Sequence, residues 1–154
     1  MLPKELIELL NAREFIYCGT CDLHGKPFIA PKFFVKVEGN SIYLVDFVFG
    51  RIWENLKLNP WISVSLMNYD NLFGYQINGV AELITSGKEY DTITADLRER
   101  EVSLTAERVI KSIQKGKRHK HFEVAFPSRM VILKVGVQEI VELAPSGSLA
   151  RQKI

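Results

Sequence analysis

The sequence is poor in cysteine, carries little net charge and contains no long apolar segment. Its 154 residues include two cysteines, too few for a disulfide scaffold, so we expect a protein of the reducing cytoplasm. No apolar run approaches the roughly 18 residues of a transmembrane helix, and the opening MLPKE lacks the continuous apolar stretch of a secretory signal. The net charge of +2 does not suggest a protein whose main task is to bind a polyanion. We therefore expect a cytoplasmic protein without a membrane span, and a nucleic-acid partner is disfavoured.

The chain has enough apolar residues to build a core. Hydrophobic residues make up 47% of the sequence, and the length suits one domain over residues 1–154. Strand-like patterns occur at residues 15–21, 28–37, 42–48, 62–66, 73–85 and 130–141. Strands in meander order with few helices indicate a mainly β (α+β) fold, a small antiparallel β-barrel with helical additions.

Helices are expected at three places. A short one opens the chain after Pro3, and a second spans residues 51–58 before Asn59-Pro60. A helical insertion covers about residues 87–120, where we expect two helices broken near Ser103. The end of the chain, about residues 144–154, is rich in small and polar residues and is expected to be a loose tail.

Two strands carry more detailed expectations. In the second strand the alternation places two sets of side chains on opposite faces: Ile29, Phe33, Val35 and Val37 on one, Lys32 and Lys36 on the other. In the fifth strand, Gly74 and Gly79 are expected to mark a bulge or a close approach of backbones.

The start of the helix at residues 51–58 is the strongest candidate site. A helix N-terminus presents unpaired N–H groups and the positive end of its dipole, so it suits a phosphate. Arg51 adds a planar guanidinium at that point. An exposed, solvated Arg51 is the alternative, and local features alone favour it.

The wider sequence shifts the preference from a solvated Arg51 toward phosphate binding. Several short segments follow one another in an order and spacing typical of a known protein family. They are GKPFIAP at residues 25–31, Gly50-Arg51, ENL at 54–56, Asn59-Pro60, GYQING at 74–79 and Ala81-Glu82. Together they resemble the pyridoxamine 5′-phosphate oxidase-like family of FMN-binding split β-barrels. The resemblance covers most of residues 14–142, without the helical insertion.

The resemblance implies FMN as cofactor and a set of residues that hold it. In this family a basic residue at the position of Arg51 binds the FMN phosphate, and Ile52 stands where many members have a second polar or basic residue. The other positions implied to border the flavin are Ala30, Pro31, Lys32, Phe33, Val45, Asp46, Phe47, Asn55 and Gln76. Gln76, with Asn78, is implied to reach the site across a dimer interface, and Lys32 to stabilise charge on the reduced ring.

The resemblance also implies a function. It predicts a homodimeric flavoprotein oxidoreductase that acts on an unidentified small-molecule substrate, electron donor or acceptor, with no assigned catalytic side chain. The alternative is a non-enzymatic protein that binds flavin, deazaflavin or haem. True pyridoxine phosphate oxidases carry a C-terminal motif with Arg and Trp. This chain ends with ELAPSG at 142–147 and Arg151 but no Trp, so we expect a different substrate.

Two other motifs compete with this interpretation. Cys18 and Cys21 have the C-x-x-C spacing of redox dithiols, but residues three apart on a strand face opposite ways, so structural cysteines are favoured. A zinc site with His24, His119 or His121 would have an unusual spacing, and no metal is expected. The basic run at residues 115–121 is interpreted as a solvated helix end, with substrate contact as the alternative.

Overall fold

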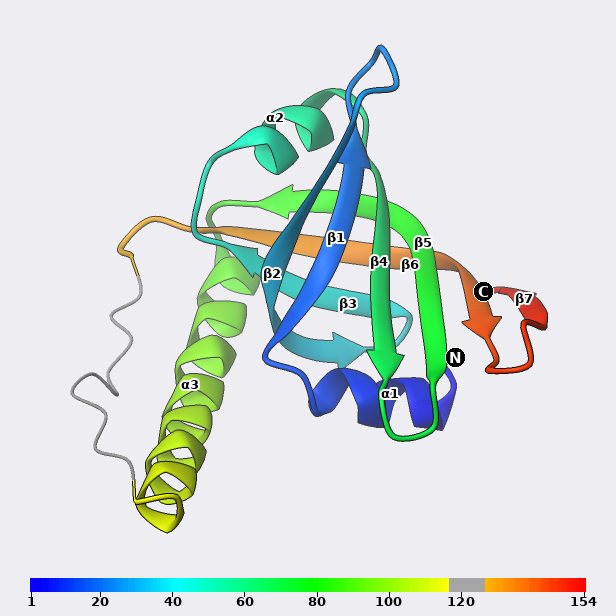
Figure 1. Cartoon of the computed structure of the whole chain (residues 1–154). Coiled ribbons are helices and arrows are strands. Elements are labelled where there is room, and N and C mark those ends of the chain that lie inside the picture. The colour runs from blue at the N-terminus through cyan, green and yellow to red at the C-terminus, as the bar shows by residue number, and fades with distance from the viewer. Residues whose placement is uncertain (117–126) are drawn as a thin grey trace.

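The computed structural model describes residues 1–116 and 127–154. The helices are α1 (Lys4–Asn11), α2 (Arg51–Leu58) and α3 (Lys88–Gln114). The strands are β1 (Phe15–Cys21), β2 (Pro27–Glu38), β3 (Ser41–Asp46), β4 (Trp61–Asn68), β5 (Phe73–Ile84), β6 (Val131–Leu143) and β7 (Leu149–Lys153). Figure 1 shows the strands wrapped around a common interior, with α3 on one side. No described helix is both long and apolar enough to span a membrane.

Six strands close into an antiparallel barrel, which confirms the predicted fold class. The strands follow the order β3-β2-β1-β4-β5-β6-β7, and a further pairing of β3 with β6 closes the ring. β6 pairs with β3 over Val131 to Gly136 and with β7 over Glu139 to Leu143. The barrel is therefore closed along one half of β6 and split along the other.

A close backbone contact at Gly79 accompanies this split. The register between β5 and β6 shifts between Asn78 and Gly79. A Cβ atom added to Gly79 would lie 2.4 Å from the Gly136 carbonyl oxygen, so a side chain at this position would force the two strands apart. The prediction that Gly79 marks a bulge and a close approach is confirmed.

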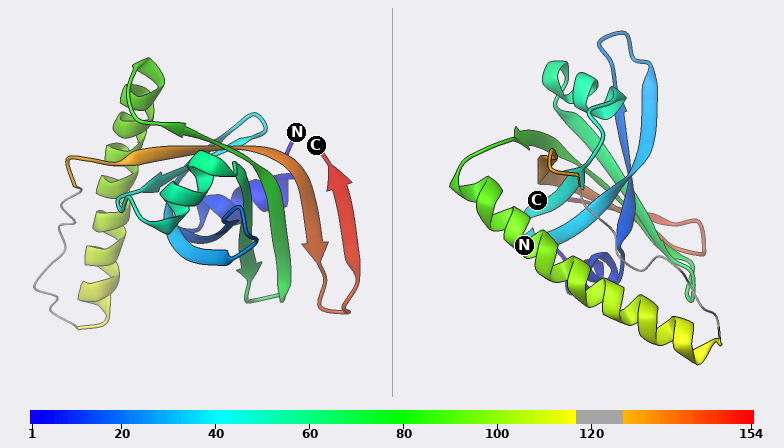
Figure 2. Two further views of the ribbon diagram at one scale, coloured as in Figure 1. Left: turned by 90° about the horizontal axis from the view of Figure 1, so that it is seen from above. Right: turned by 90° about the vertical axis from the view of Figure 1, so that its left-hand side faces the viewer.

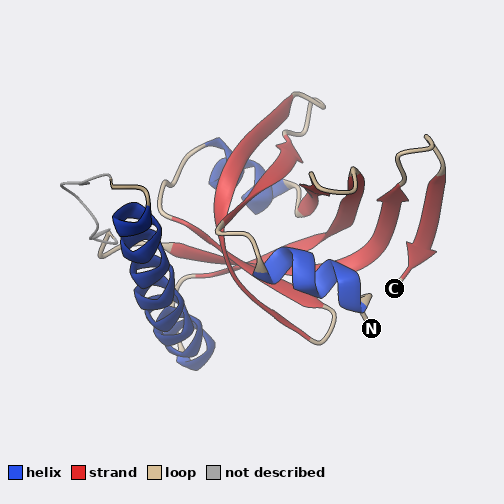
Figure 3. Ribbon diagram, turned by 60° about the horizontal axis from the view of Figure 1, so that its bottom comes forward, coloured by secondary structure: helices blue, strands red, loops and turns tan. Residues whose placement is uncertain are grey.

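The barrel interior holds the main hydrophobic core, to which α1 and α2 contribute. Leu6 and Leu10 of α1 and Ile52 and Leu56 of α2 belong to the same buried cluster as the inward side chains of the strands. Figures 1 and 3 show α1 at one end of the barrel and α2 at the other. The two short helices thus bury their apolar faces by closing the ends of the barrel.

α3 covers the outer surface of β2 and β3 (Figure 2). Ile93 and Leu97 of α3 form a second buried cluster with residues of β2, β3 and β6, among them Phe33, Val45 and Ile132. The helix is continuous from Lys88 to Gln114, so the expected break near Ser103 is wrong. Ser is tolerated within a long helix, and the docked N-terminal half supports the turns that follow.

Two further expectations need correction. A register shift between Phe34 and Lys36 interrupts β2, so Phe33, Phe34 and Val35 are all buried and the predicted alternation does not continue through the strand. Residues 149–153, expected within a loose tail, form β7, because the second half of β6 offers them a free strand edge. The apolar pattern did not reveal β7, since all of its residues are exposed.

Polar groups anchor the first turn of α3 to the barrel. The Glu89 carboxylate accepts a hydrogen bond of 2.8 Å from the Tyr43 hydroxyl and pairs with the Lys134 ammonium at 2.8 Å. The bond from Lys134, followed by that from Tyr43, holds the pKa of Glu89 below its ordinary value. The charged form is therefore favoured in the folded protein.

We predict that protonation of Glu89 lowers the free energy of unfolding at acid pH. A carboxylate with a lowered pKa stabilises the fold fully above its unfolded pKa of about 4.3, and this contribution is lost as pH falls through the lower folded value. In urea unfolding at pH 7 and pH 3, Glu89→Gln should lose less stability on acidification than wild type. Glu99→Gln, an exposed position on α3, is the matched control; equal acid losses in all three proteins would contradict the prediction.

Candidate functional site

The junction of β3 and α2 combines a free helix start with a guanidinium. Gly50 is the N-cap residue of α2 and no side chain caps the helix. The Arg51 side chain is 71% exposed and makes a surface ion pair of 3.1 Å with Glu54. Such an exposed pair contributes little stability, so Arg51 can exchange Glu54 for an anion at little cost. Ile52 is buried in the core and turns away from this position.

A second guanidinium borders the same loop. Arg129 lies over the Phe49 ring, 4.5 Å from its centroid, and Phe49 packs edge-on against Trp53 of α2. Phe49 precedes Arg51 by two residues, so Arg129 adds positive charge beside the loop that leads into the helix. The sequence analysis did not single out Arg129, because only the pairing of β3 with the start of β6 brings it near this loop.

Buried amides fix α2, and with it Arg51, against β1. Asn55 donates a hydrogen bond of 3.0 Å to the Thr20 hydroxyl, and Asn59 donates one of 3.3 Å to the Cys21 carbonyl. Both Asn55 and Thr20 are buried. The structure thus places Asn55, one of the predicted flavin neighbours, in a contact that positions the helix.

The other predicted residues of β2 and β3 divide between the two faces of the sheet. Phe33 and Val45 are buried beneath α3, Phe47 packs against the same cluster, and Pro31 is exposed. Ala30 packs against the interior cluster, and Lys32 and Asp46 are also turned inward. Neighbouring residues of a strand point to opposite faces, so the side chains of Ala30 to Phe33 do not all face the same side of the sheet.

Lys32 and Asp46 form a buried ion pair. The Lys32 ammonium and Asp46 Oδ1 are 2.8 Å apart, with side chains 9% and 2% exposed. Asp46 Oδ1 also accepts a hydrogen bond from the Val48 N–H, whereas Asp46 Oδ2 is buried and has no partner among the described residues. The positive charge of Lys32 is therefore compensated inside the barrel, on the face of β2 opposite Phe33.

An aromatic run lies on the outer face of the same strands. Phe33 contacts Phe15 edge-on with ring centroids 5.4 Å apart, and it contacts Phe47 at 6.4 Å. These rings and the Arg51 loop occupy adjoining positions, because β3 ends one residue before Phe47. Phe33 itself is buried, so the surface open to a ligand is formed by Phe15 and the exposed part of Phe47. This apolar surface beside a basic helix start suits a planar ring that carries a phosphate.

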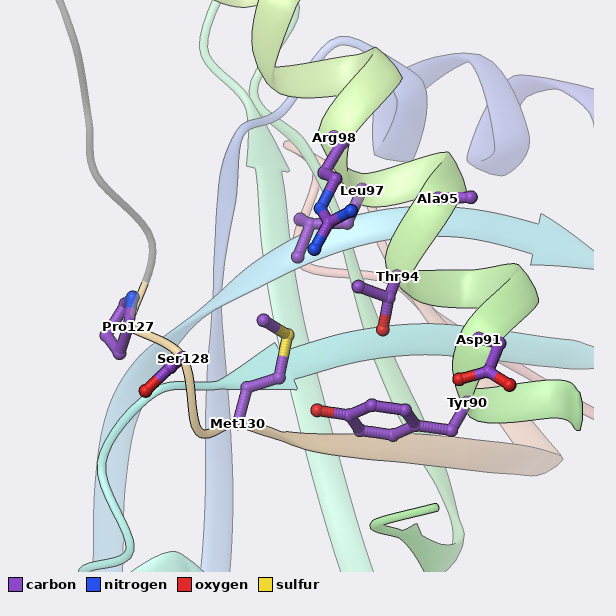
Figure 4. A pocket seen from close by; sticks show the side chains of 9 residues that line it. All are labelled: Tyr90, Asp91, Thr94, Ala95, Leu97, Arg98, Pro127, Ser128 and Met130. Carbon is purple, nitrogen blue, oxygen red and sulfur yellow. The ribbon is translucent and has the colours of Figure 1, made fainter. Parts of the chain in front are cut away.

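A pocket of about 540 Å³ lies next to the buried cluster that contains Phe33 (Figure 4). Leu97 and Met130 in its wall belong to the same buried cluster as Phe33 and Val45. Tyr90, Thr94 and Arg98, four residues apart on one face of α3, also line it. Thr94 Oγ1 is buried without a hydrogen-bond partner among the described residues. Because Asp91 lines it as well as Arg98, the pocket can receive a small ligand that carries both an anionic group and hydrogen-bond donors.

The sequence analysis did not name any of these pocket residues. The spacing of two hydroxyls and a guanidinium along one helix face was visible in the sequence. This spacing indicates a pocket only together with Met130, however, and only the tertiary fold brings Met130 opposite α3.

The predicted Gln76 lies on a different part of the surface. β1 and β4 separate its strand, β5, from β2 in the sheet, so one protomer does not bring Gln76 to Phe33. Its surroundings include exposed apolar side chains of neighbouring strands, among them Tyr17, Ile29 and Trp61. A groove of about 540 Å³ crosses this face, lined by Gly19, Ile29, Trp61, Asn78 and Glu139 among others. An apolar face of this kind marks an interaction surface.

The two cysteines do not form a dithiol site. Cys18 is fully buried inside the barrel, and burial raises the pKa of its thiol to about 12. Cys21 lines the outer groove and is partly exposed. Residues 1–116 and 127–154 contain no group of His, Cys, Asp and Glu side chains that could hold a metal ion. His119, His121 and most of the basic run fall within residues 117–126, outside the described part of the chain.

Comparisons with known proteins agree with this fold. The family model of pyridoxamine 5′-phosphate oxidase matches residues 2–127. No curated protein sequence matches the chain.

Solved structures with a similar fold include an FMN-binding protein and a haem storage protein. HupZ of Group A Streptococcus is 22% identical with a TM-score of 0.67, over 97% of this chain and 99% of that one. A pyridoxamine 5′-phosphate oxidase-related, FMN-binding protein from Nostoc punctiforme is 14% identical with a TM-score of 0.60, over 100% and 98% of the two chains. HutZ, the haem storage protein from Vibrio cholerae, is 16% identical with a TM-score of 0.61, over 89% and 90%. At these identities the likeness concerns the fold.

We predict that a thiol reagent does not modify Cys18 in the native protein. Reaction requires an accessible thiolate, and burial keeps Cys18 protonated and out of reach. In Cys21→Ser, where Cys18 is the remaining thiol, the native protein should stay unmodified and the unfolded protein should gain one label per chain, as counted by mass spectrometry. Rapid labelling of Cys18 in the native variant would refute the prediction.

Proposed function

The chain belongs to the pyridoxamine 5′-phosphate oxidase family, and from this premise we propose that it is an FMN-binding, homodimeric oxidoreductase acting on a small molecule. The observation that carries the proposal is the uncapped, Arg51-bearing start of α2 beside the exposed rings of Phe15 and Phe47. We further propose that residues 1–154 form one domain and that the protein works in the cytoplasm, where its free thiols stay reduced.

The residues of this region fit FMN. Arg51 and the free N–H groups of α2 bind the phosphate, and Arg129 supplies the second positive charge that Ile52 does not provide. Phe15 and Phe47, which keep part of their rings exposed, pack against the flavin ring and exclude water from it, while the buried Phe33 supports both of them from below. Bound FMN would supply hydride and electron transfer.

The pocket beneath α3 is where we place the substrate. Arg98 binds its negative charge and the Tyr90 hydroxyl orients it by a hydrogen bond, while Asp91 in the same lining accepts a hydrogen bond from a donor on the substrate. The Met130 and Leu97 side chains form the apolar wall and separate the substrate from solvent. This polar lining differs from the Arg- and Trp-containing C-terminal motif of pyridoxine phosphate oxidases, so we propose a different substrate.

A second copy of the chain completes the proposed site. The apolar face around Ile29 and Trp61 is where the copies meet, and Gln76 then reaches the flavin bound to the partner. Ile29 is 68% exposed and Trp61 is 54% exposed, and burial of such large side chains is a main source of dimer stability.

Haem storage is the second candidate, supported by the fold shared with HutZ. The visible absorbance spectrum of the purified protein distinguishes the two. Flavin bands support the proposal, whereas a haem Soret band would replace FMN with haem. If reduced bound flavin is not reoxidised by any candidate acceptor, the protein binds flavin without turnover.

We predict that Arg51→Ala weakens FMN binding much more than riboflavin binding. A charge-assisted contact to a phosphate contributes about 1.5–3 kcal/mol, roughly a ten- to hundredfold change in dissociation constant, and riboflavin has no phosphate. Arg51→Lys should restore part of the affinity, because it keeps the charge without the guanidinium fork. Flavin fluorescence titration measures each constant. Equal losses for both ligands would show that Arg51 acts through structure, and a wild type that binds neither would remove FMN from the proposal.

We predict that Ile29→Glu dissociates the dimer. Two carboxylates brought into an apolar interface lose hydration without gaining partners, so the monomer is favoured. Light scattering at micromolar concentration should give a dimer mass for wild type and a monomer mass for the variant. Val102→Glu, at a 72% exposed position on α3, is the matched control and should stay dimeric. A monomeric wild type with bound flavin would overturn the shared site.

A further inference from the structure

Polar side chains form a continuous hydrogen-bonded row across the otherwise apolar outer face. Arg151 of β7 pairs with Glu139 of β6 at 3.4 Å, and Asn78 of β5 donates a hydrogen bond of 2.8 Å to Glu139. Asn78 Oδ1 in turn accepts hydrogen bonds from the Ser63 hydroxyl at 2.9 Å and from Gln76 Nε2 at 3.1 Å. We call these five residues the amide relay.

The chemistry of Glu139 sets the direction of every bond in the relay. An ionised carboxylate can only accept, so Asn78 must turn its NH₂ group toward Glu139. The carbonyl oxygen of Asn78 then faces Ser63 and Gln76, and it too can only accept. Gln76 must therefore turn its NH₂ group inward, which directs its carbonyl oxygen away from the relay.

The outward carbonyl oxygen of Gln76 has room for a donor. In residues 1–116 and 127–154, no hydrogen bond reaches Gln76 Oε1, although both amide groups of the relay are only partly exposed. A half-buried carbonyl that becomes covered by a second protomer needs a donor to avoid a desolvation penalty. The relay thus specifies a hydrogen-bond donor on whatever covers this face.

We propose that Glu139, held by Arg151, is a positioning residue that orients the Gln76 carboxamide to accept a hydrogen bond from the imide N–H (N3–H) of the flavin bound to the second copy. The inference rests on the proposed function, from which it takes the flavin and the dimer. It adds a role for β6 and β7, neither of which carries a predicted flavin contact, and it assigns Gln76 an acceptor role toward one edge of the ring.

The ionisation of Glu139 supports this direction at neutral pH. The hydrogen bond from Asn78, followed by the contact with Arg151, lowers the pKa of Glu139 below its ordinary value. Lys153, the residue of β7 that pairs with Glu139 across the strands, also favours the ionised carboxylate. The carboxylate therefore stays an obligate acceptor until the solution becomes clearly acidic.

Glu139→Gln tests the relay, because a carboxamide can either donate or accept. The substituted side chain can donate to Asn78 Oδ1, which lets Asn78 and then Gln76 rotate and present an NH₂ group outward. Glu142→Gln, three residues along the same strand, is the matched control. Without any ligand, the side-chain amide NMR signals of Asn78 and Gln76 should shift below pH 4.5 in wild type and in Glu142→Gln, but not in Glu139→Gln. Side-chain amide signals of Asn78 and Gln76 that do not shift with pH in wild type would overturn the relay.

The ligand contact is tested with FMN and 3-methyl-FMN, which lacks the imide N–H. Wild type and Glu142→Gln should prefer FMN, and the preference should fall by roughly two- to tenfold in Glu139→Gln, the effect of one hydrogen bond. FMN binding with an unchanged preference in Glu139→Gln would overturn the inference and leave the proposed function intact. A wild type that binds no FMN would overturn the proposed function and the ligand contact together, while the NMR result still decides the relay.

Discussion

The burial of β3 and of the middle of β2, Lys32 to Val35, on both faces is the constraint on which the rest of the molecule depends. The inner side chains of these segments fill the barrel, and the outer ones pack beneath α3. Each residue of these segments is therefore committed to one of two environments. The interior receives a compensated ion pair between Lys32 and Asp46, and the exterior receives the aromatic rings. A buried pair of this kind costs desolvation energy, so its charges are best regarded as a fixed part of the barrel.

The same constraint explains why the site lies at the edges of the barrel. The interior is filled by side chains, as is usual for a small barrel, and the loops and the added helix supply the surfaces that remain. α2 is held by Asn55 and Asn59 against β1, so Arg51 projects from a rigid base. α3 docks through its N-terminal half and places Tyr90, Thr94 and Arg98 opposite Met130.

Local patterns in the sequence were sufficient for the barrel strands, for α2 and for Gly79, because these features depend on alternation, helix signals and backbone sterics. The bulge in β2 was not predictable in this way, since Val35 is apolar and fits either face. β7 was missed because it buries no side chain and exists only through backbone pairing with β6. Ala30, Pro31, Lys32 and Phe33 were predicted together as flavin neighbours, although neighbouring side chains of a strand face opposite ways. Arg129 and the pocket beneath α3 were not predicted, because they depend on contacts between distant parts of the chain.

β6 changes its pairing strand from β3 to β7 along its length, and this change affects the tendency of the protein to aggregate. From Glu139 to Leu143 this strand no longer pairs with β3, and β7 covers the edge that β3 leaves open. Without β7, the segment QEIVEL would present unpaired N–H and C=O groups beside Ile140 and Val141, which is a template for strand addition by other molecules. β7 moves the open edge to a strand that carries Arg151 and Lys153, whose charges disfavour such stacking. A cut by a protease in the Ser146–Ser148 turn, followed by release of β7, would therefore remove only Ile154 from the margin of the core and expose an aggregation-prone strand edge.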